Sequence, residues 1–174
     1  TKNSDLTVYQ PSPFWEELAA KGSHQLKQYG FKNFKRTVNM KYFNWNILGI
    51  VRHQLLPVLA NWLVQPDRSV FSAKFNNYKD ALYPDIKSFN VISAIVYRLY
   101  VAMLFNYVAK LDTLKLLDRL NEPLVGNPFV ISFKGVETSQ DICNSVHEFY
   151  QSGGLEAVGG GTWNVLEIGA GYGR

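Results

Sequence analysis

The feature that most constrains this chain is an apolar run that leads straight into a glycine-rich turn near residue 170. The run from Val165 to Ile168 has the continuous apolar character of a buried parallel strand. A G-x-G-x-G turn follows from Gly169. Its first glycine permits a tight turn, its second lets the backbone approach a ligand, and its third lets the next helix pack closely on the strand. This pattern is typical of the start of a doubly wound, nucleotide-binding domain.

Two classes of nucleotide ligand use such a turn, and two residues separate them. The dinucleotide fingerprint G-x-G-x-x-G/A needs a small residue at its sixth position, where this chain has Arg174. Glu167 stands two residues before the first glycine, where a carboxylate suits a cationic ligand better than a pyrophosphate. S-adenosylmethionine carries an ammonium and a sulfonium group, so the residues favour it over NAD. A glycine turn that binds nothing is the third alternative, because G-x-G-x-G alone is weak evidence.

Residues 165–173 resemble motif I of class I S-adenosylmethionine-dependent methyltransferases. The longer pattern is similar to the sugar O-methyltransferases associated with bacterial surface polysaccharides, through residues 13–15, 33–39, 42–43 and 137–141. The resemblance implies a set of residues around the methionine and ribose of the cofactor: Glu167, Gly169, Ala170, Gly171 and Gly173.

The same resemblance implies a mainly α fold in two parts. Residues 1–136 would form a helical N-terminal domain that shapes the acceptor site, and residues 137–174 would begin a Rossmann-like α/β domain that binds the cofactor. In such enzymes the ribose and adenine contacts and a general base come from later strands. We therefore expect this chain to be the N-terminal part of an O-methyltransferase acting on a sugar or polysaccharide hydroxyl, cut after motif I and inactive by itself.

Apolar periodicity predicts the helices that precede the motif. We expect helices over residues 13–29, 47–64, 74–82, 88–110, 113–120 and 139–150, and one strand over residues 129–133. The helix over 47–64 is expected to bend near Pro57. The helix over 88–110 is apolar almost all round, but Arg98 lies at its centre. A central arginine is costly in a bilayer, so this segment is expected to be a core helix rather than a membrane span.

Short polar residues mark the ends of several of these helices. Ser12, followed by a proline, predicts the first N-cap, and Gly30 predicts a left-handed C-cap. Asp112 is expected to cap the helix over 113–120. Thr138 and Asp141 have the spacing of a capping box for the last helix.

No catalytic residue can be assigned from the sequence. The histidines that could act as a general base are His24, His53 and His147. A single histidine on an amphipathic helix is more often a packing residue, although His147 lies on the helix before the motif. Other side chains suit sugar binding but more often cap helices or pack in cores: Asp80, Asp85, Trp15, Tyr42, Phe43 and Trp45. One cysteine, Cys143, and three scattered histidines predict no metal site and no internal disulfide.

The charge of +4 is unevenly placed along the chain. Between Glu17 and Asp67 there is no carboxylate, and all the charged residues there are basic: Lys21, Lys27, Lys32, Lys35, Arg36, Lys41 and Arg52. We expect a solvated face, with no nucleic-acid partner. The alternative is a non-enzymatic module that binds an anionic glycan or nucleic acid, with charge reversal at Lys35 and Arg36 as its test. The single cysteine favours a reducing, cytoplasmic location, and the oligomeric state is not predicted.

Overall fold

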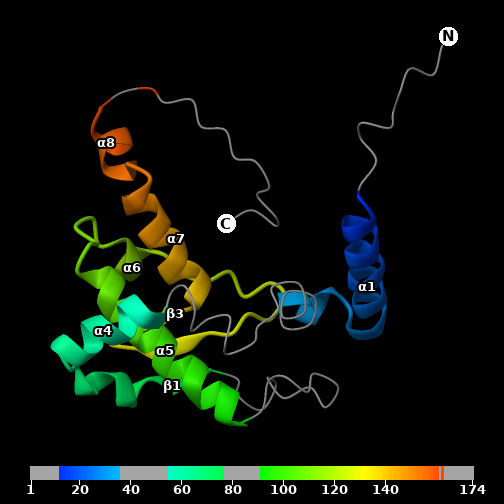
Figure 1. The fold of residues 1–174 in the computed structure, drawn as a ribbon, viewed down its shortest axis with the longest axis horizontal. Coiled ribbons are helices and arrows are strands. Elements are labelled where there is room, and N and C mark those ends of the chain that lie inside the picture. The colour runs from blue at the N-terminus through cyan, green and yellow to red at the C-terminus, as the bar shows by residue number, and fades with distance from the viewer. Residues whose placement is uncertain (1–11, 36–54, 77–90, 161, 163–174) are drawn as a thin grey trace.

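A computed structural model describes residues 12–35, 55–76, 91–160 and 162 of the chain. This part is mainly helical, as expected, with one small antiparallel sheet (Figure 1). The helical elements are α1 (Pro13–Tyr29), η2 (Phe31–Asn33), α4 (Leu56–Val64), η4 (Arg68–Ser72), α5 (Val91–Ala109), α6 (Leu116–Arg119), α7 (Gln140–Gln151) and α8 (Gly154–Gly159). The strands are β1 (Lys74–Phe75), β2 (Ile131–Phe133) and β3 (Val136–Thr138).

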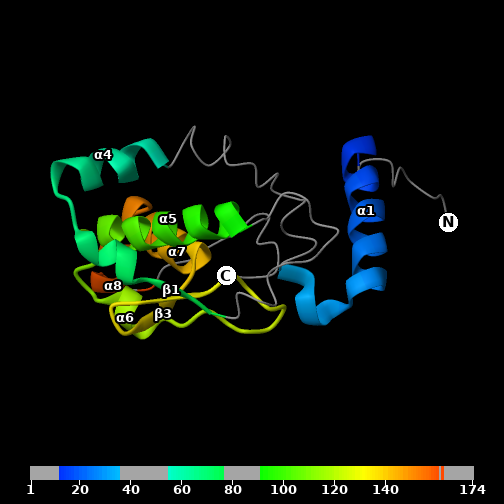
Figure 2. The same ribbon diagram turned by 90° about the horizontal axis from the view of Figure 1, so that it is seen from below.

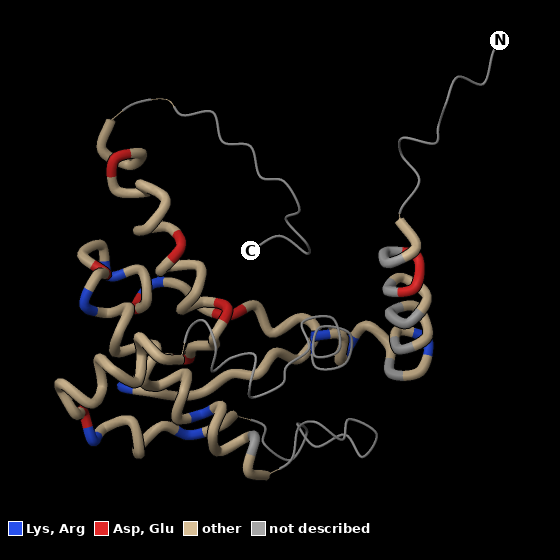
Figure 3. Tube along the Cα trace, viewed as in Figure 1, with Lys and Arg blue, Asp and Glu red and all other residues tan. Residues whose placement is uncertain are grey.

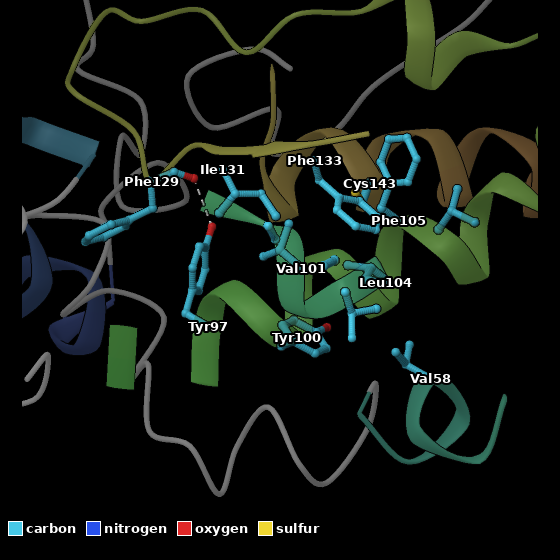
Figure 4. Close-up of a cluster of buried hydrophobic side chains, with 14 of the residues drawn as sticks. Val58, Tyr97, Tyr100, Val101, Leu104, Phe105, Phe129, Ile131, Phe133 and Cys143 are labelled. Carbon is cyan, nitrogen blue, oxygen red and sulfur yellow. Dashed lines mark hydrogen bonds between the residues drawn. The ribbon is translucent and has the colours of Figure 1, made fainter. Parts of the chain in front are cut away.

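Helix α5 forms the centre of the core. It packs against α4, α7 and β2, and these elements bury its side chains over most of its length. Figure 4 shows Val101, Leu104 and Phe105 of α5 among Phe133 of β2 and Cys143 of α7. From Tyr97 to Val108 the apolar side chains on different faces of the helix are covered by different neighbours. Four apolar residues near the start of the helix are exposed: Val91, Ile92, Ile95 and Val96. Among the described residues, no helix combines the length and apolarity needed to cross a membrane.

The sheet has the order β1-β2-β3, with both pairs antiparallel. Ile131 and Phe133 point into the core, and the intervening Ser132 lies on the other face. A two-residue turn joins β2 to β3, and Lys134 and Gly135 both have positive φ angles in it, of 50° and 81°. Two positive φ angles match the right-handed twist of a hairpin. The predicted strand is confirmed over β2.

Two elements of the sheet differ from the sequence prediction. The helix expected over 74–82 is wrong at its beginning, because residues 74–75 form β1 and pair with Ser132 and Ile131. Strand β3 was not expected at all. Both strands have only two or three residues, so backbone pairing with β2 decides their conformation rather than any alternation of their own.

The helix ends follow the predicted caps with small shifts. Helix α1 begins after Ser12 and ends before Gly30, as expected, but the Ser12 side chain makes no capping hydrogen bond. Gly30 has the predicted positive φ, of 68°, but its ψ of 172° lies outside the left-handed helical region that was expected. The N-cap of α7 is Ser139 and not Thr138, because Thr138 belongs to β3; the Ser139 hydroxyl accepts from the Ile142 amide at 3.1 Å. Asp112 does cap α6, but the helix begins at Leu116 rather than at residue 113.

The remaining helix predictions are confirmed or lie outside the described residues. Within the segment expected over 47–64, the described helix α4 holds Pro57 in its first turn, where proline fits without a bend. Helix α8 was not expected, since glycines flank and begin it. The boundary proposed after residue 136 stays a prediction; residues on both sides of it pair in the β2–β3 hairpin.

Helix α1 stands apart from the rest of the molecule in both ribbon views (Figures 1 and 2). We call residues 12–35 the arm, and residues 55–76 and 91–160 the body. Among side chains that the structure describes, none from the arm belongs to the hydrophobic core. The arm reaches the body through its last residues, next to the loop that precedes β2.

Candidate functional site

The residues predicted to bind the cofactor lie outside the described residues, in the segment 163–174. Several upstream candidates also lie outside them: His53, Asp80, Asp85, Tyr42, Phe43 and Trp45. The side chain of Trp15 on α1 is likewise outside the described part. The structure therefore tests the histidines on α1 and α7, the cysteine, and the basic residues of the arm.

The two described histidines are not brought together. His24 is exposed on α1, in the arm, whereas His147 is half-buried on α7. The imidazole of His147 lies against the ring of Tyr107 on α5, with 5.7 Å between the ring centroids. Its ring helps α7 to pack on α5, which is the packing role that a single histidine on an amphipathic helix most often has.

Cys143 lies deep in the core at the first turn of α7. Its sulfur is 3.6 Å from the hydroxyl of Thr138. Burial raises the pKa of the Cys143 thiol to about 12, because a thiolate loses its hydration there. The thiol stays protonated at neutral pH and is a poor nucleophile. The prediction that Cys143 is a packing residue is confirmed.

A buried ionic cluster joins three distant parts of the chain. The Lys35 ammonium donates to Glu122 Oε1 at 2.5 Å, and Ser139 Oγ donates to Glu122 Oε2 at 2.6 Å. All three residues are buried. Lys35 also donates to the carbonyl of Pro123 at 3.3 Å. We call this the Lys35–Glu122–Ser139 cluster. No local sequence pattern predicts this cluster, because its two charged members are 87 positions apart.

The cluster corrects one reading of the basic stretch. Lys35 was grouped with residues that could face an anionic partner or solvent. Its ammonium instead forms a buried ion pair with Glu122. Lys27 and Lys32 are exposed, as a solvated face requires. In the view of Figure 3, acidic and basic residues are interspersed along the described elements. Neither observation favours a binding surface for polyanions centred on Lys35.

A second polar group lies at the surface, where η4, α5 and the β2–β3 turn meet. Asp67 Oδ2 accepts from Lys134 at 2.8 Å and from the Asn106 amide at 3.1 Å, while Oδ1 accepts from the Ser69 amide. The hydrogen bond from Lys134 is the main reason that the pKa of Asp67 lies well below its usual range. These contacts cap η4 and tie the turn to α5, so the group has a structural role.

The part of the chain that the structure describes holds no group of three or more His, Cys, Asp or Glu side chains suited to a metal ion. Comparison of the chain with protein-family models, with curated proteins and with solved structures finds no match to any of them.

Proposed function

We propose that this chain belongs to an S-adenosylmethionine-dependent O-methyltransferase that acts on a sugar or polysaccharide hydroxyl. The observation that carries the proposal is the sequence of residues 165–173, an apolar run with an internal carboxylate followed by three glycines at alternate positions. The mainly helical body is compatible with the helical N-terminal domain expected before such a motif. The sugar acceptor rests on the family resemblance alone.

The chemistry of the motif matches a cationic ligand. S-adenosylmethionine supplies an electrophilic methyl group on a sulfonium sulfur. The carboxylate of Glu167 is suited to the positive charge of such a ligand, and the glycines at 169, 171 and 173 leave room for the backbone to approach it. Ala170 completes the proposed contact set between the first two glycines. The acceptor hydroxyl would lose its proton to a general base held in alignment.

Three described side chains that could in principle serve as that base are poorly placed or protonated. His147 contacts Tyr107, and Cys143 is buried and protonated. His24 lies on the arm, well apart from α7 in both ribbon views. We propose that none of these three side chains is the base. A cytoplasmic location is part of the same proposal, because a chain with a single cysteine forms no internal disulfide, as is usual in reducing compartments.

Calorimetric titration tests the proposal. S-adenosylmethionine and NAD are titrated separately into the full-length protein, as unchanged protein and as the variants Glu167→Ala and Gly171→Val. Glu148→Ala is the matched control, because it removes an exposed carboxylate from α7, outside the motif. We expect saturable binding of S-adenosylmethionine that Glu167→Ala weakens at least about tenfold, which is a loss of about 1.4 kcal/mol. Gly171→Val should abolish binding, and the control should leave it unchanged.

The same titration decides between the proposal and its rivals. Binding of NAD without S-adenosylmethionine would replace the proposal with an NAD-dependent sugar-modifying enzyme. Absence of both from a folded protein would leave the basic stretch as the remaining candidate. Its binding to polyanions should then fall steeply with added salt. The burial of Lys35 counts against that last reading, because one of its charges is already paired.

A further inference from the structure

The end of the arm is seated on the loop that precedes β2 by several independent contacts. The backbone amide of Lys35 donates to the carbonyl of Gly126 at 3.0 Å. The side-chain amide of Asn127 donates to the Asn33 side-chain oxygen at 3.0 Å. The Lys35 ammonium continues past this loop to Glu122. One backbone contact, one amide pair and one ion pair therefore fix two residues at the end of the arm, Asn33 and Lys35.

Of these contacts, the ion pair has the largest desolvation cost. The side chains of Lys35 and Glu122 are 7% and 4% exposed, so both charges have lost most of their water. Such a pair is tolerable only when its remaining hydrogen-bonding positions are filled. Ser139 fills one of them, because its hydroxyl donates to Glu122 while accepting from the Ile142 amide. The carboxylate thus links the arm to the first turn of α7.

A steric fit adds to the electrostatic one. Gly126 has a φ of 83°, and a Cβ atom placed on it would lie 2.4 Å from the ring of Phe34. The missing side chain therefore makes the space in which Phe34 rests. Any other residue at 126 would meet both an unfavourable backbone conformation and this ring.

We propose that the Lys35–Glu122–Ser139 cluster and the Gly126 seat form a latch that docks the arm on the body. Docking is an equilibrium distinct from the folding of the core. The arm lends no described side chain to the core, so its release leaves the packing of α5 and the sheet in place. Removing one charge strands the other in a dry site, and release of the arm is then the route by which that charge regains water. The latch is independent of the cofactor proposal.

Hydrogen exchange followed by mass spectrometry tests the latch. The probe is the peptide that holds residues 30–35, since the Lys35 amide is bonded across the seat; the internal reference is a peptide within α5. The variants are Lys35→Met, Glu122→Gln and Gly126→Ala. Lys32→Met is the matched control, because it removes an exposed lysine three positions before Lys35.

We expect each of the three variants to speed exchange in the arm peptide by about tenfold or more, with α5 changed by less than about twofold, as for local rather than global opening. Lys32→Met should change neither. The double variant Lys35→Met/Glu122→Met should exchange more slowly in the arm than either single charge variant, because no buried charge is left unpaired.

Two results would overturn the proposal. If α5 loses protection together with the arm, the cluster belongs to the core and its loss unfolds the molecule. If the arm peptide exchanges at the same rate in Glu122→Gln and in the unchanged protein, the ion pair does not hold the arm. Gly126→Ala keeps both charges, so it separates the steric seat from the ion pair whichever way the charge variants behave.

Discussion

The body and the arm are held in place by different physics. In the body, α5 buries apolar side chains against α4, α7 and the sheet, and aromatic pairs such as Phe105 and Phe133 fill the space between them. The arm keeps its described helical side chains largely exposed and meets the body through the buried ion pair of Lys35 and Glu122. Apolar burial is tolerant of detail, whereas a buried charge depends on one partner at one position. Substitutions should therefore lower the stability of the body by amounts that grade with the buried side chain removed. Loss of either charge of the ion pair should release the arm.

The largest expected contrast is in thiol reactivity. In the variant Ser23→Cys the new thiol lies on the exposed part of α1, while Cys143 stays in the core with a pKa of about 12. At pH 8 an ordinary thiol is about one quarter thiolate, and Cys143 is so only to roughly one part in ten thousand. We expect iodoacetamide to label the introduced thiol about a thousandfold faster or more. Mass spectrometry of timed samples measures both rates, and comparable rates in the folded protein would show that the core is open to solvent.

The second expected effect is a loss of core stability. Phe133 is 2% exposed and meets Phe105 edge to face at 5.6 Å between ring centroids. Phe133→Ala removes this contact and leaves a cavity, so we expect the free energy of unfolding to fall by about 3–5 kcal/mol. Phe31→Ala is the control, because Phe31 in the arm is 76% exposed; its effect should stay within about 0.5 kcal/mol. Urea unfolding measures both, and equal losses would erase the distinction between body and arm.

The third expected effect is the loss of stability when a polar anchor within the body is removed. Asp112 accepts from the amides of Leu116 and Leu117 and from the hydroxyl of Tyr150, so it caps α6 and ties it to α7. Asp112→Ala should cost about 1–2 kcal/mol, the usual range for a lost cap. Asp118→Ala, which removes an exposed carboxylate from the same helix, should have little effect. Urea midpoints that do not differ between the two variants would contradict the capping role.

The smallest expected effect is at the surface. The pKa of Asp67 is lowered in the folded protein, chiefly by Lys134. Its stabilising contribution is therefore present above the unfolded pKa of about 4 and is lost as the pH falls below that value. The pair is well exposed, so the contribution should be under about 1 kcal/mol. Urea unfolding at pH 7 and pH 2.5 should show slightly less acid destabilisation in Lys134→Met than in the unchanged protein; an equal or greater loss in the variant would contradict this assignment.

The same contrast explains which parts of the fold could be predicted from the sequence. Helices α1, α5 and α7 were predicted because apolar spacing and end signals such as Gly30 are local. The cap of α7 was misplaced by one residue, since Thr138 and Ser139 are both good caps and only the pairing of β3 with β2 separates them. Strand β1 was missed for a similar reason. Its two residues take their conformation from a partner strand far along the chain.

The residues of the candidate site also differ in how well the sequence predicts them. The residues proposed to contact the cofactor were identified from a contiguous motif, which sequence displays directly. The Lys35–Glu122–Ser139 cluster was not, because a lysine in a basic stretch and a glutamate in a loop give no local sign that they will meet. The one available signal was Gly126 in the turn before β2, a glycine whose role becomes clear only when Phe34 lies against it.

Photochemical labelling tests most directly the central claim about function, that residues 163–174 bind S-adenosylmethionine. Methyl-tritiated S-adenosylmethionine is irradiated with the full-length protein, and the labelled peptides are mapped by mass spectrometry. Our account predicts label in the peptide that begins after Lys134 and includes residues 163–174, reduced by Glu167→Ala and unchanged by Glu148→Ala. Absence of label from a folded protein, or label confined to residues 27–52, would contradict it.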